Sequence, residues 1–183
     1  MSHAGTGTPA DDRPILVALG TSLGDRLQQL TDAVTHLTRA KGVRVVRVSA
    51  VYDTAPVGGV ATERFLNAAV ELTTELSPLA LLDTLQTIEA ALGRTRWQRW
   101  EDRTIDLDLV FWGRRVVELP RLRIPHPELH RRRFVLQPLV DVAPDALHPT
   151  LGKTLQELLE ALPEEADSCI RQPEKILTGA PNR

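Results

Sequence analysis

The chain contains little of several residue types, and each scarcity excludes a class of protein. Its 183 residues include one cysteine, Cys169, which excludes an internal disulfide and a cysteine-based metal cluster. No apolar run is long enough to span a bilayer. Residues 1–13 lack the basic start and apolar stretch of a signal peptide. These absences predict a cytoplasmic protein with no membrane partner.

Lysine and aromatic residues are also scarce, and the basic and aromatic residues are unevenly distributed. Only three of the 22 basic residues are lysines, and the others are arginines. Residues 94–133 contain eleven arginines against six acids, although the net charge of the chain is −2. Five of the seven aromatic residues lie between Trp97 and Phe134. This arginine-rich segment within an otherwise acidic chain favours an anionic ligand.

The remaining composition is that of an ordinary globular protein. Hydrophobic residues make up 42% and charged residues 25%, which excludes disordered and fibrous classes. The length suits one domain, and the pattern places it at residues 14–163, with flexible tails at 1–13 and 164–183. We expect a monomer.

The hydrophobic pattern predicts an α+β fold. Strands are expected at 15–19, 43–51, 65–76 and 105–112, and helices from Asp25 to Gly42 and from Ser77 to Gly93. This order, β-α-β-β-α-β, is typical of a ferredoxin-like core, an antiparallel sheet with helices on one face. Extra C-terminal elements follow. They are a strand at 116–119, an irregular stretch at 120–133, a helix or short strand at 134–139 and a helix at 155–162, whereas 53–61 is expected to be a loop.

The strongest chemical signal is a pair of aspartates in the fourth strand. Side chains alternate along a strand, so Asp106 and Asp108 share one face, with Cα atoms about 7 Å apart. Leu107, Leu109 and Phe111 are expected on the other face. Two carboxylates on one face suit a hard cation such as Mg²⁺, which also binds substrate phosphates. Taken alone, the pattern also fits a half-buried strand with solvated acids.

Arginines flank this strand on both sides. Their guanidinium groups suit phosphate oxygens, so the clusters and the aspartates together indicate a metal-bound polyphosphate. The alternative is a solvated basic surface. The flanking arginines are Arg94, Arg96, Arg99, Arg103, Arg121, Arg123, Arg131, Arg132 and Arg133.

Three weaker features have both a functional and a structural interpretation. Trp100, in a polar loop, either closes over a substrate or packs on the core. His126 lies between two prolines that stiffen its backbone, but a lone histidine is more often structural. Residues 20–24 open a helix and suit an anion, although the absence of the Walker lysine makes a tight turn the simpler interpretation.

Together these features resemble one family, the 6-hydroxymethyl-7,8-dihydropterin pyrophosphokinases of folate biosynthesis. The resemblance covers about residues 15–150. Its most specific motifs are Arg103–Leu109 and Ile124–Pro127, and further motifs match at 18–25, 52–58 and 65–69.

The sequence departs from the family pattern at a few positions. Ser22 replaces the usual asparagine, Ala55 a common proline, and Pro127 a residue that is tyrosine in some members. The loop around 97–99 is one residue shorter than in some relatives. None of these departures removes the two aspartates.

The resemblance implies an enzyme that transfers pyrophosphate from ATP to the hydroxymethyl group of the pterin and releases AMP. Asp106 and Asp108 would bind two Mg²⁺ ions, and Asp106 would help to deprotonate the hydroxyl. The other catalytic residues implied are Arg94 and Arg103. The implied ATP-binding residues are Gln86, Glu89, Arg96, Arg99, Trp100, Leu109, Arg121, His126 and Arg132. The implied pterin-binding residues are Thr54, Val57, Phe65, Asn67 and Phe134.

Two other functions are compatible with this element order. RNA-recognition modules share it, but their aromatic-rich strand motif is absent here, and two carboxylates would oppose a phosphate backbone. No nucleic-acid partner is therefore expected. A regulatory domain that binds nucleotide without turnover is the second alternative.

Overall fold

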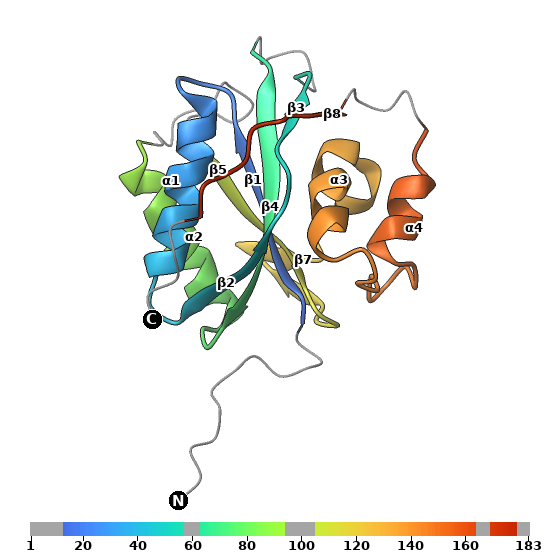
Figure 1. Ribbon diagram of the computed structural model, residues 1–183. Helices are drawn as coiled ribbons and strands as arrows, with labels where there is room; N and C mark the ends of the chain where they lie inside the picture. Colours follow the sequence, from blue (N-terminus) through green and yellow to red (C-terminus); the bar gives the residue numbers. More distant parts are fainter. Residues whose placement is uncertain (1–12, 57–62, 94–104, 164–168, 179–183) are drawn as a thin grey trace, which may run out of the picture.

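An antiparallel sheet with helices on both faces forms the centre of the molecule (Figure 1). The computed structural model describes residues 13–56, 63–93, 105–163 and 169–178. In chain order the elements are β1 (Ile15–Thr21), α1 (Arg26–Arg39), β2 (Val43–Val48), β3 (Tyr52–Thr54), β4 (Phe65–Thr74), α2 (Pro78–Ala91), β5 (Asp106–Trp112), β6 (Val117–Leu119), β7 (Leu122–Ile124), a 3₁₀ turn (Leu129–Arg131), α3 (Arg133–Val142), α4 (Leu155–Glu160) and β8 (Cys169–Arg171).

The longest strand, β4, organises the sheet. It pairs with β1 along one side, and on its other side its first half pairs with β3 and its second half with β2. β5 extends the sheet beyond β1, and β8 extends it beyond β3. The strand order is therefore β5-β1-β4-β3-β8, with β2 beside β4. The predicted antiparallel sheet with helices is confirmed, and its ferredoxin-like assignment remains a prediction.

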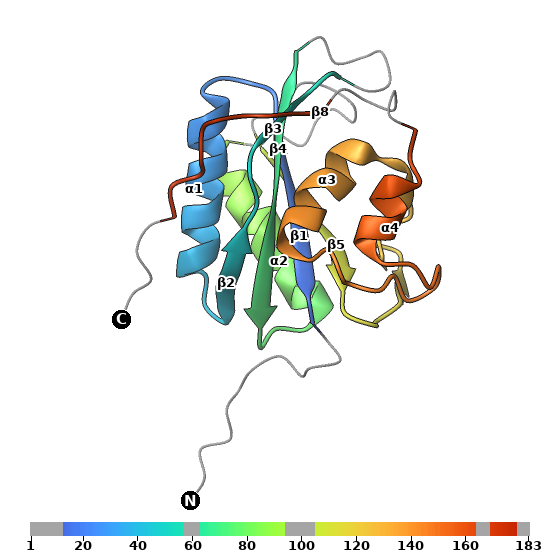
Figure 2. The same cartoon turned by 45° about the vertical axis from the view of Figure 1, so that its right-hand side comes forward.

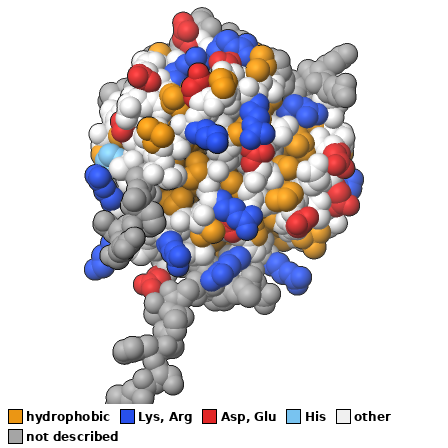
Figure 3. Space-filling model, in the orientation of Figure 1, with side chains coloured by type: hydrophobic (Ala, Val, Ile, Leu, Met, Phe, Trp, Pro, Cys, Tyr) orange, Lys and Arg blue, Asp and Glu red, His pale blue; other side chains and the backbone are white. Residues whose placement is uncertain are grey.

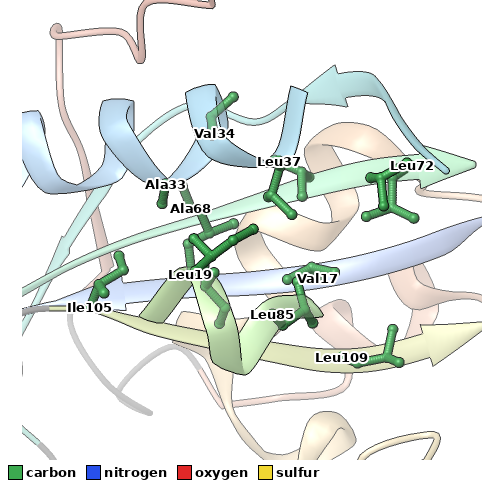
Figure 4. Packing of buried hydrophobic residues seen from close by; sticks show 14 of the residues in the cluster. Val17, Leu19, Ala33, Val34, Leu37, Ala68, Leu72, Leu85, Ile105 and Leu109 are labelled. Carbon is green, nitrogen blue, oxygen red and sulfur yellow. The ribbon is translucent and has the colours of Figure 1, made fainter. Parts of the chain in front are cut away.

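The larger hydrophobic core lies between one face of the sheet and the helices α1 and α2. Figure 4 shows Leu37 of α1 and Leu85 of α2 pointing toward β1, whose Val17 and Leu19 belong to the same buried cluster as Val34 of α1. All five side chains are buried, and burial of a side chain of this size contributes about 1.5–3 kcal/mol. The predicted apolar stripes of both helices therefore form this core.

The opposite face of the sheet is covered by α3 and α4 (Figure 2). Leu16 of β1 and Phe111 of β5 pack there against Leu136, Leu139 and Leu155. The two helices of the predicted core, α1 and α2, do share one face of the sheet, and the extra C-terminal helices α3 and α4 cover the other, because the central strands are apolar on both faces.

Local capping explains where the two long helices begin. The Asp25 carboxylate accepts a hydrogen bond from the backbone N–H of Gln28 at 3.0 Å, which caps α1. The Ser77 hydroxyl accepts one from Ala80 at 3.2 Å, and Pro78 occupies the first position of α2. The predicted start of α2 is confirmed.

A bulge in β5 corrects the predicted alternation of its side chains. Leu16 is paired with Phe111 but Val17 is paired with Leu109, so Val110 is an extra residue on β5. Phe111 consequently packs with the α3 layer, and the prediction that it shares a face with Leu109 is wrong. The aspartates precede the bulge, so their common face is unaffected.

The segment near the C-terminus corrects the predicted domain boundary. The prediction of a flexible tail from residue 164 is wrong for residues 169–178, because β8 pairs with β3 and Ile176 is only 8% exposed. The backbone of β3 would otherwise leave an unpaired sheet edge, which β8 covers. The short length of β8 explains why the sequence carries little signal for it.

Three shorter segments also differ from the expectation. Residues 53 and 54, predicted to be loop, belong to β3 because Tyr52–Thr54 pairs with β4. Residues 122–124, predicted to be irregular, form β7 against β6. The undecided stretch 134–139 is helical and belongs to α3.

Candidate active site

A row of paired residues crosses four strands on the face that α3 partly covers. Asp106 on β5 is paired with Gly20 on β1, Gly20 with Asn67 on β4, and Asn67 with Tyr52 on β3. Neighbouring strands are about 4.8 Å apart, so Asp106 and Asn67 lie about 10 Å apart with a glycine between them. The row therefore leaves a floor without a side chain between the carboxylate and the amide.

The two predicted metal ligands lie at one end of this row. Asp106 is half-buried and Asp108 is exposed, whereas Leu107 between them is buried on the opposite face. Among the described residues, no group of three or more histidine, cysteine, aspartate or glutamate side chains is suited to a metal ion. Oxygen donors of this kind fit Mg²⁺, and its remaining ligands would then be phosphate oxygens and water.

The predicted pterin residues on the sheet lie at the other end of the row. Asn67 is 7% exposed, and its Nδ2 donates a hydrogen bond to the Thr54 Oγ1 at 2.6 Å. Phe65 is half-buried and is paired with Thr54. The hydrogen bond to Thr54 fixes the amide with its Oδ1 toward the row, where a Cβ added at Gly20 would lie 3.2 Å from it.

An ion-pair cluster joins the two ends of the chain segment between β3 and β4. The half-buried Asp53 on β3 accepts a hydrogen bond from the Nε of Arg64, and Arg26 at the start of α1 lies 3.6 Å from the other carboxylate oxygen. Arg26 also donates to the Arg64 carbonyl at 2.8 Å. This cluster holds the entry and exit of the segment that contains Ala55 and Val57.

Phe134 lies in the first turn of α3, the helix that packs on β4. The Arg132 guanidinium lies 5.9 Å from the centroid of its ring, within range of a cation–π contact. Arg132 also lowers the pKa of His126 through its charge, so the three residues occupy one region. Two predicted nucleotide residues are thus adjacent to one predicted pterin residue.

His126 is held in one tautomer beside the aspartate pair. Its backbone N–H donates to the Val110 carbonyl at 2.9 Å, and its Nδ1 accepts from the Glu128 N–H at 3.2 Å. Burial and then the charge of Arg132 lower its pKa below 6.5, against the opposing charges of Glu128 and Asp106. A neutral imidazole with Nδ1 as acceptor carries its proton on Nε2, which can donate to a phosphate oxygen.

The predicted nucleotide residues of α2 lie along the outer edge of β5. The Arg121 Nη2 lies 2.6 Å from Asp83 Oδ1 and 3.3 Å from Gln86 Oε1. Glu89 is 5% exposed, and its Oε1 accepts from the Leu107 N–H at 2.7 Å, between the two aspartates. Glu89 therefore supports the strand that carries them.

The remaining predicted residues lie in the core, at the surface or outside the described part of the chain. Leu109 is only 4% exposed and lies in the larger hydrophobic core, between the sheet and the helices α1 and α2. Arg123 and Arg131 are exposed, and Arg131 lies 3.9 Å from Glu128. Six predicted site residues lie outside the described part of the chain: Val57, Arg94, Arg96, Arg99, Trp100 and Arg103.

Two residues close to this row, Tyr52 and Asp141, are not among the predicted site residues. Tyr52 lies in the row on β3, where it is also paired with Arg171 of β8, and its hydroxyl donates to both carboxylate oxygens of Asp141 on α3. Tyr52 lies in the family motif at 52–58, and Asp141 is an acid near the C-terminus of a helix, where the dipole disfavours it. From sequence alone, residues 134–139 are undecided between helix and strand, so Asp141 could not be recognised as a residue at a helix end.

A buried histidine outside the site predicts loss of stability in acid. His148 is 5% exposed, and its Nδ1 accepts from the Leu151 N–H at 3.2 Å. Burial and then the charge of His130 lower its pKa, so the unfolded chain takes up this proton first as the pH falls. The free energy of unfolding should therefore decrease below about pH 6.5, by about 1.4 kcal/mol for each unit by which the pKa is lowered.

Denaturant unfolding between pH 7 and pH 5 measures this effect. In the variant His148→Gln the amide oxygen can accept from the backbone without titrating, so the pH dependence should be shallower than in the wild type. Equal slopes in the variant and the wild type would contradict the prediction.

The distribution of basic side chains bears on nucleic-acid binding, and the character of the helices bears on a membrane span. On the face seen in Figure 3, arginine and lysine side chains are interspersed with acidic and apolar ones rather than gathered in one patch. Within the described ranges, no helix has the length and apolar character needed to cross a membrane.

Comparison with known proteins identifies the family. The model of the family 7,8-dihydro-6-hydroxymethylpterin-pyrophosphokinase (HPPK) matches residues 16–144. A 2-amino-4-hydroxy-6-hydroxymethyldihydropteridine pyrophosphokinase of Pseudomonas aeruginosa is 44% identical over 151 residues, 82% of this chain and 93% of that protein. A protein of the same name from Bacillus subtilis is 45% identical over 126 residues, 69% of this chain and 75% of that protein.

Solved structures show the same fold at low identity. The Plasmodium falciparum HPPK-DHPS wild type with pterin and p-hydroxybenzoate has a TM-score of 0.63 and 16% identity, over 80% of this chain and 41% of that chain. This chain thus spans less than half of that two-part protein. The family match includes Asn67, the aspartate pair and Phe134, and relatives match at over 40% identity along most of their length. The chain therefore belongs to the HPPK family.

Proposed function

We propose that this chain transfers pyrophosphate from ATP to the hydroxymethyl group of 6-hydroxymethyl-7,8-dihydropterin and releases AMP, a step of folate biosynthesis. The observation that carries the proposal is the row that crosses the sheet, in which Gly20 separates Asp106 from Asn67. A span of about 10 Å suits a triphosphate beside the carboxylates and a fused ring beside the amide.

The pterin end of the row recognises a flat, polar heterocycle. The Asn67 amide offers a hydrogen-bond group at the ring edge, and its donor contact with Thr54 keeps it in one orientation. Phe65 and Phe134 supply aromatic faces between which the ring stacks. Val57, in the loop after β3, completes this set.

At the phosphate end, Asp106 and Asp108 would hold two Mg²⁺ ions. These ions would neutralise charge on the triphosphate. His126 donates from Nε2 to a phosphate oxygen, and Arg132 pairs with another. The nucleotide also contacts Gln86, Glu89, Arg96, Arg99, Trp100, Leu109 and Arg121.

In the transfer, the pterin hydroxyl oxygen forms a bond to the β-phosphorus of ATP. The bond from that phosphorus to the α,β-bridging oxygen breaks, and AMP leaves with this oxygen. Asp106 receives the hydroxyl proton, while Arg94 and Arg103 stabilise the charge that develops. The reaction needs the hydroxyl close to the β-phosphorus and in line with the leaving oxygen. The row supports this by placing both substrates on one face of the sheet.

The same proposal covers the fold, the oligomeric state and the partners of the enzyme. The strand order β5-β1-β4-β2 and the two crossover helices support a ferredoxin-like core with α3, α4 and β8 added. We assign a cytoplasmic monomer that binds ATP and the pterin. A nucleic-acid-binding module is not favoured, because the family match covers the aspartate pair.

Formation of AMP from ATP and the hydroxymethyl dihydropterin tests the proposal. Purified protein should release AMP only when ATP, the pterin and Mg²⁺ are all present, and EDTA should stop the reaction. ATP without pterin is the control for simple hydrolysis. Binding of ATP without any AMP release would favour the regulatory domain and overturn the proposal.

A further inference from the structure

A buried hydrogen-bond pair joins the sheet to α3 beside the candidate site. Tyr52 on β3 is 4% exposed, and its hydroxyl lies 2.9 and 2.8 Å from the two carboxylate oxygens of Asp141. Asp141 also accepts a hydrogen bond from the Ala50 N–H at 3.1 Å. The carboxylate is therefore bonded to both the side chain and the backbone of the sheet edge.

The position of Asp141 is unfavourable for the helix itself. It lies one residue before the end of α3 at Val142, where the helix dipole repels a negative charge. Its bonds to Tyr52 and Ala50 offset this repulsion. An acid in this place is thus explained by the tertiary contact rather than by helix formation.

The helix residues involved share a stripe with the predicted pterin residue. Phe134, Gln137 and Asp141 have the spacing i, i+3, i+7, which places them on one face of α3. Gln137 also lies close enough to Tyr52 to lower the pKa of its hydroxyl, against the larger effects of burial and Asp141. Two turns of helix, about 10 Å, therefore connect the bonded end of the stripe to Phe134 at the other end.

The sheet residues involved are equally connected to the pterin end of the row. Tyr52 is paired with Asn67, and Thr54 shares its face two residues along β3. The hydrogen bond from Asn67 to Thr54 continues this connection. One bonded path thus leads from the amide, through β3 and Tyr52, to the helix that carries Phe134.

We propose that Tyr52 and Asp141 are positioning residues that hold Phe134 at a fixed distance from Asn67, and so set the affinity for the pterin. The inference rests on the proposed function. It adds two residues that do not touch the substrate. Tyr52 opens the family motif at 52–58, but the resemblance implies no role for it, and Asp141 lies outside the motifs. Loss of the hydrogen bonds between Tyr52 and Asp141 should loosen α3, and with it Phe134, over the pterin ring. The nucleotide end of the row should stay intact.

Steady-state kinetics of Tyr52→Phe and Asp141→Ala test the pair. Each variant should raise KM for the pterin about fivefold or more, as loss of one hydrogen bond allows, with KM for ATP within about twofold of wild type. Asp141→Asn keeps an oxygen that accepts from Tyr52 and should restore a KM near the wild-type value. If Tyr52→Phe fails to fold, the two Asp141 variants carry the test.

Thr154→Ala is the control for a general loss of stability. Thr154 caps α4, away from β3, so its loss should lower the melting temperature without changing KM for the pterin. If KM for the pterin were unchanged in Tyr52→Phe and Asp141→Ala, or if KM for ATP rose equally, the positioning role of Tyr52 and Asp141 would be contradicted. The proposed function would still stand. A wild-type protein without pterin-dependent AMP release would overturn both.

A spectroscopic titration observes the pair directly. Tyr52 is the only tyrosine of the chain, so the ultraviolet absorbance of tyrosinate reports this residue alone. Burial and then its contact with Asp141 raise the pKa of Tyr52 to about 12. Asp141→Asn removes the negative charge and should move the ionisation to lower pH, whereas Thr154→Ala should not. Coincident titrations of Asp141→Asn and wild type would overturn the pair.

Discussion

Replacing Asp106 with alanine is expected to reduce Mg²⁺-dependent AMP release by about 10³-fold or more. A metal bound to phosphates contributes several kcal/mol of transition-state stabilisation, and each 1.4 kcal/mol changes the rate about tenfold. Asp106 is the half-buried member of the pair and lies directly opposite Gly20, nearest to the substrate floor. Its loss removes one of the two carboxylates proposed to hold the metal.

The experiment compares single-turnover AMP release in wild type and in the variants Asp106→Ala and Asp108→Ala. Both variants should lose activity, while the pterin still binds to the Asn67 end of the row. Asp32→Ala is the matched control, because Asp32 is a carboxylate on α1 that accepts a hydrogen bond from Gln28 and has no part in the site. Wild-type activity in Asp106→Ala would contradict the proposed mechanism.

The parts of the fold predicted from the sequence are those with strong local signals. The helix that follows Ser77 and Pro78 was predicted because a cap, a proline and an apolar stripe agree. The change of face after Leu109 was not predicted. It results from a bulge that adds one residue to β5, and the bulge depends on pairing with β1. The pairing of Cys169–Arg171 was missed for a similar reason, since three residues have no periodicity.

The candidate site shows the same division between local and long-range information. The common face of Asp106 and Asp108 follows from alternation alone, and the structure agrees with it. The proximity of Asn67 to Asp106 depends on two strand registers, neither of which can be read from either segment alone. The partner of Tyr52 lies 89 residues further along the chain, so only the folded arrangement reveals it.

Gly20 is the position where the floor of the site depends on a missing side chain. In the sequence it was one residue of a turn motif, but in the structure it lies in β1 between Asp106 and Asn67. A Cβ at this position would lie 3.2 Å from the Asn67 Oδ1, tighter than an ordinary contact. The hydrogen bond to Thr54 restrains the amide from moving away.

Gly20→Val is therefore expected to lower kcat/KM for the pterin about 10²-fold, because a displacement near 1 Å at a reacting centre has an effect of this size. Gly20→Ala should show a smaller loss, since a methyl group requires only a small shift of the amide. ATP affinity should change little in either variant. The crowded contact with the amide should lower the melting temperature of Gly20→Val by a few degrees at most, because valine itself suits a strand.

Gly24→Ala separates an effect on the site from an effect on stability. Gly24 has a φ of 65°, which disfavours a side chain, but nothing lies within 4 Å of an added Cβ. This variant should lose stability and keep kcat/KM for the pterin, whereas Gly20→Val should lose far more kcat/KM than its small loss of stability explains. If both variants showed the same loss of pterin turnover at the same loss of stability, the bare floor between Asp106 and Asn67 would have no specific role, and the size of residue 20 would not limit how the two substrates approach.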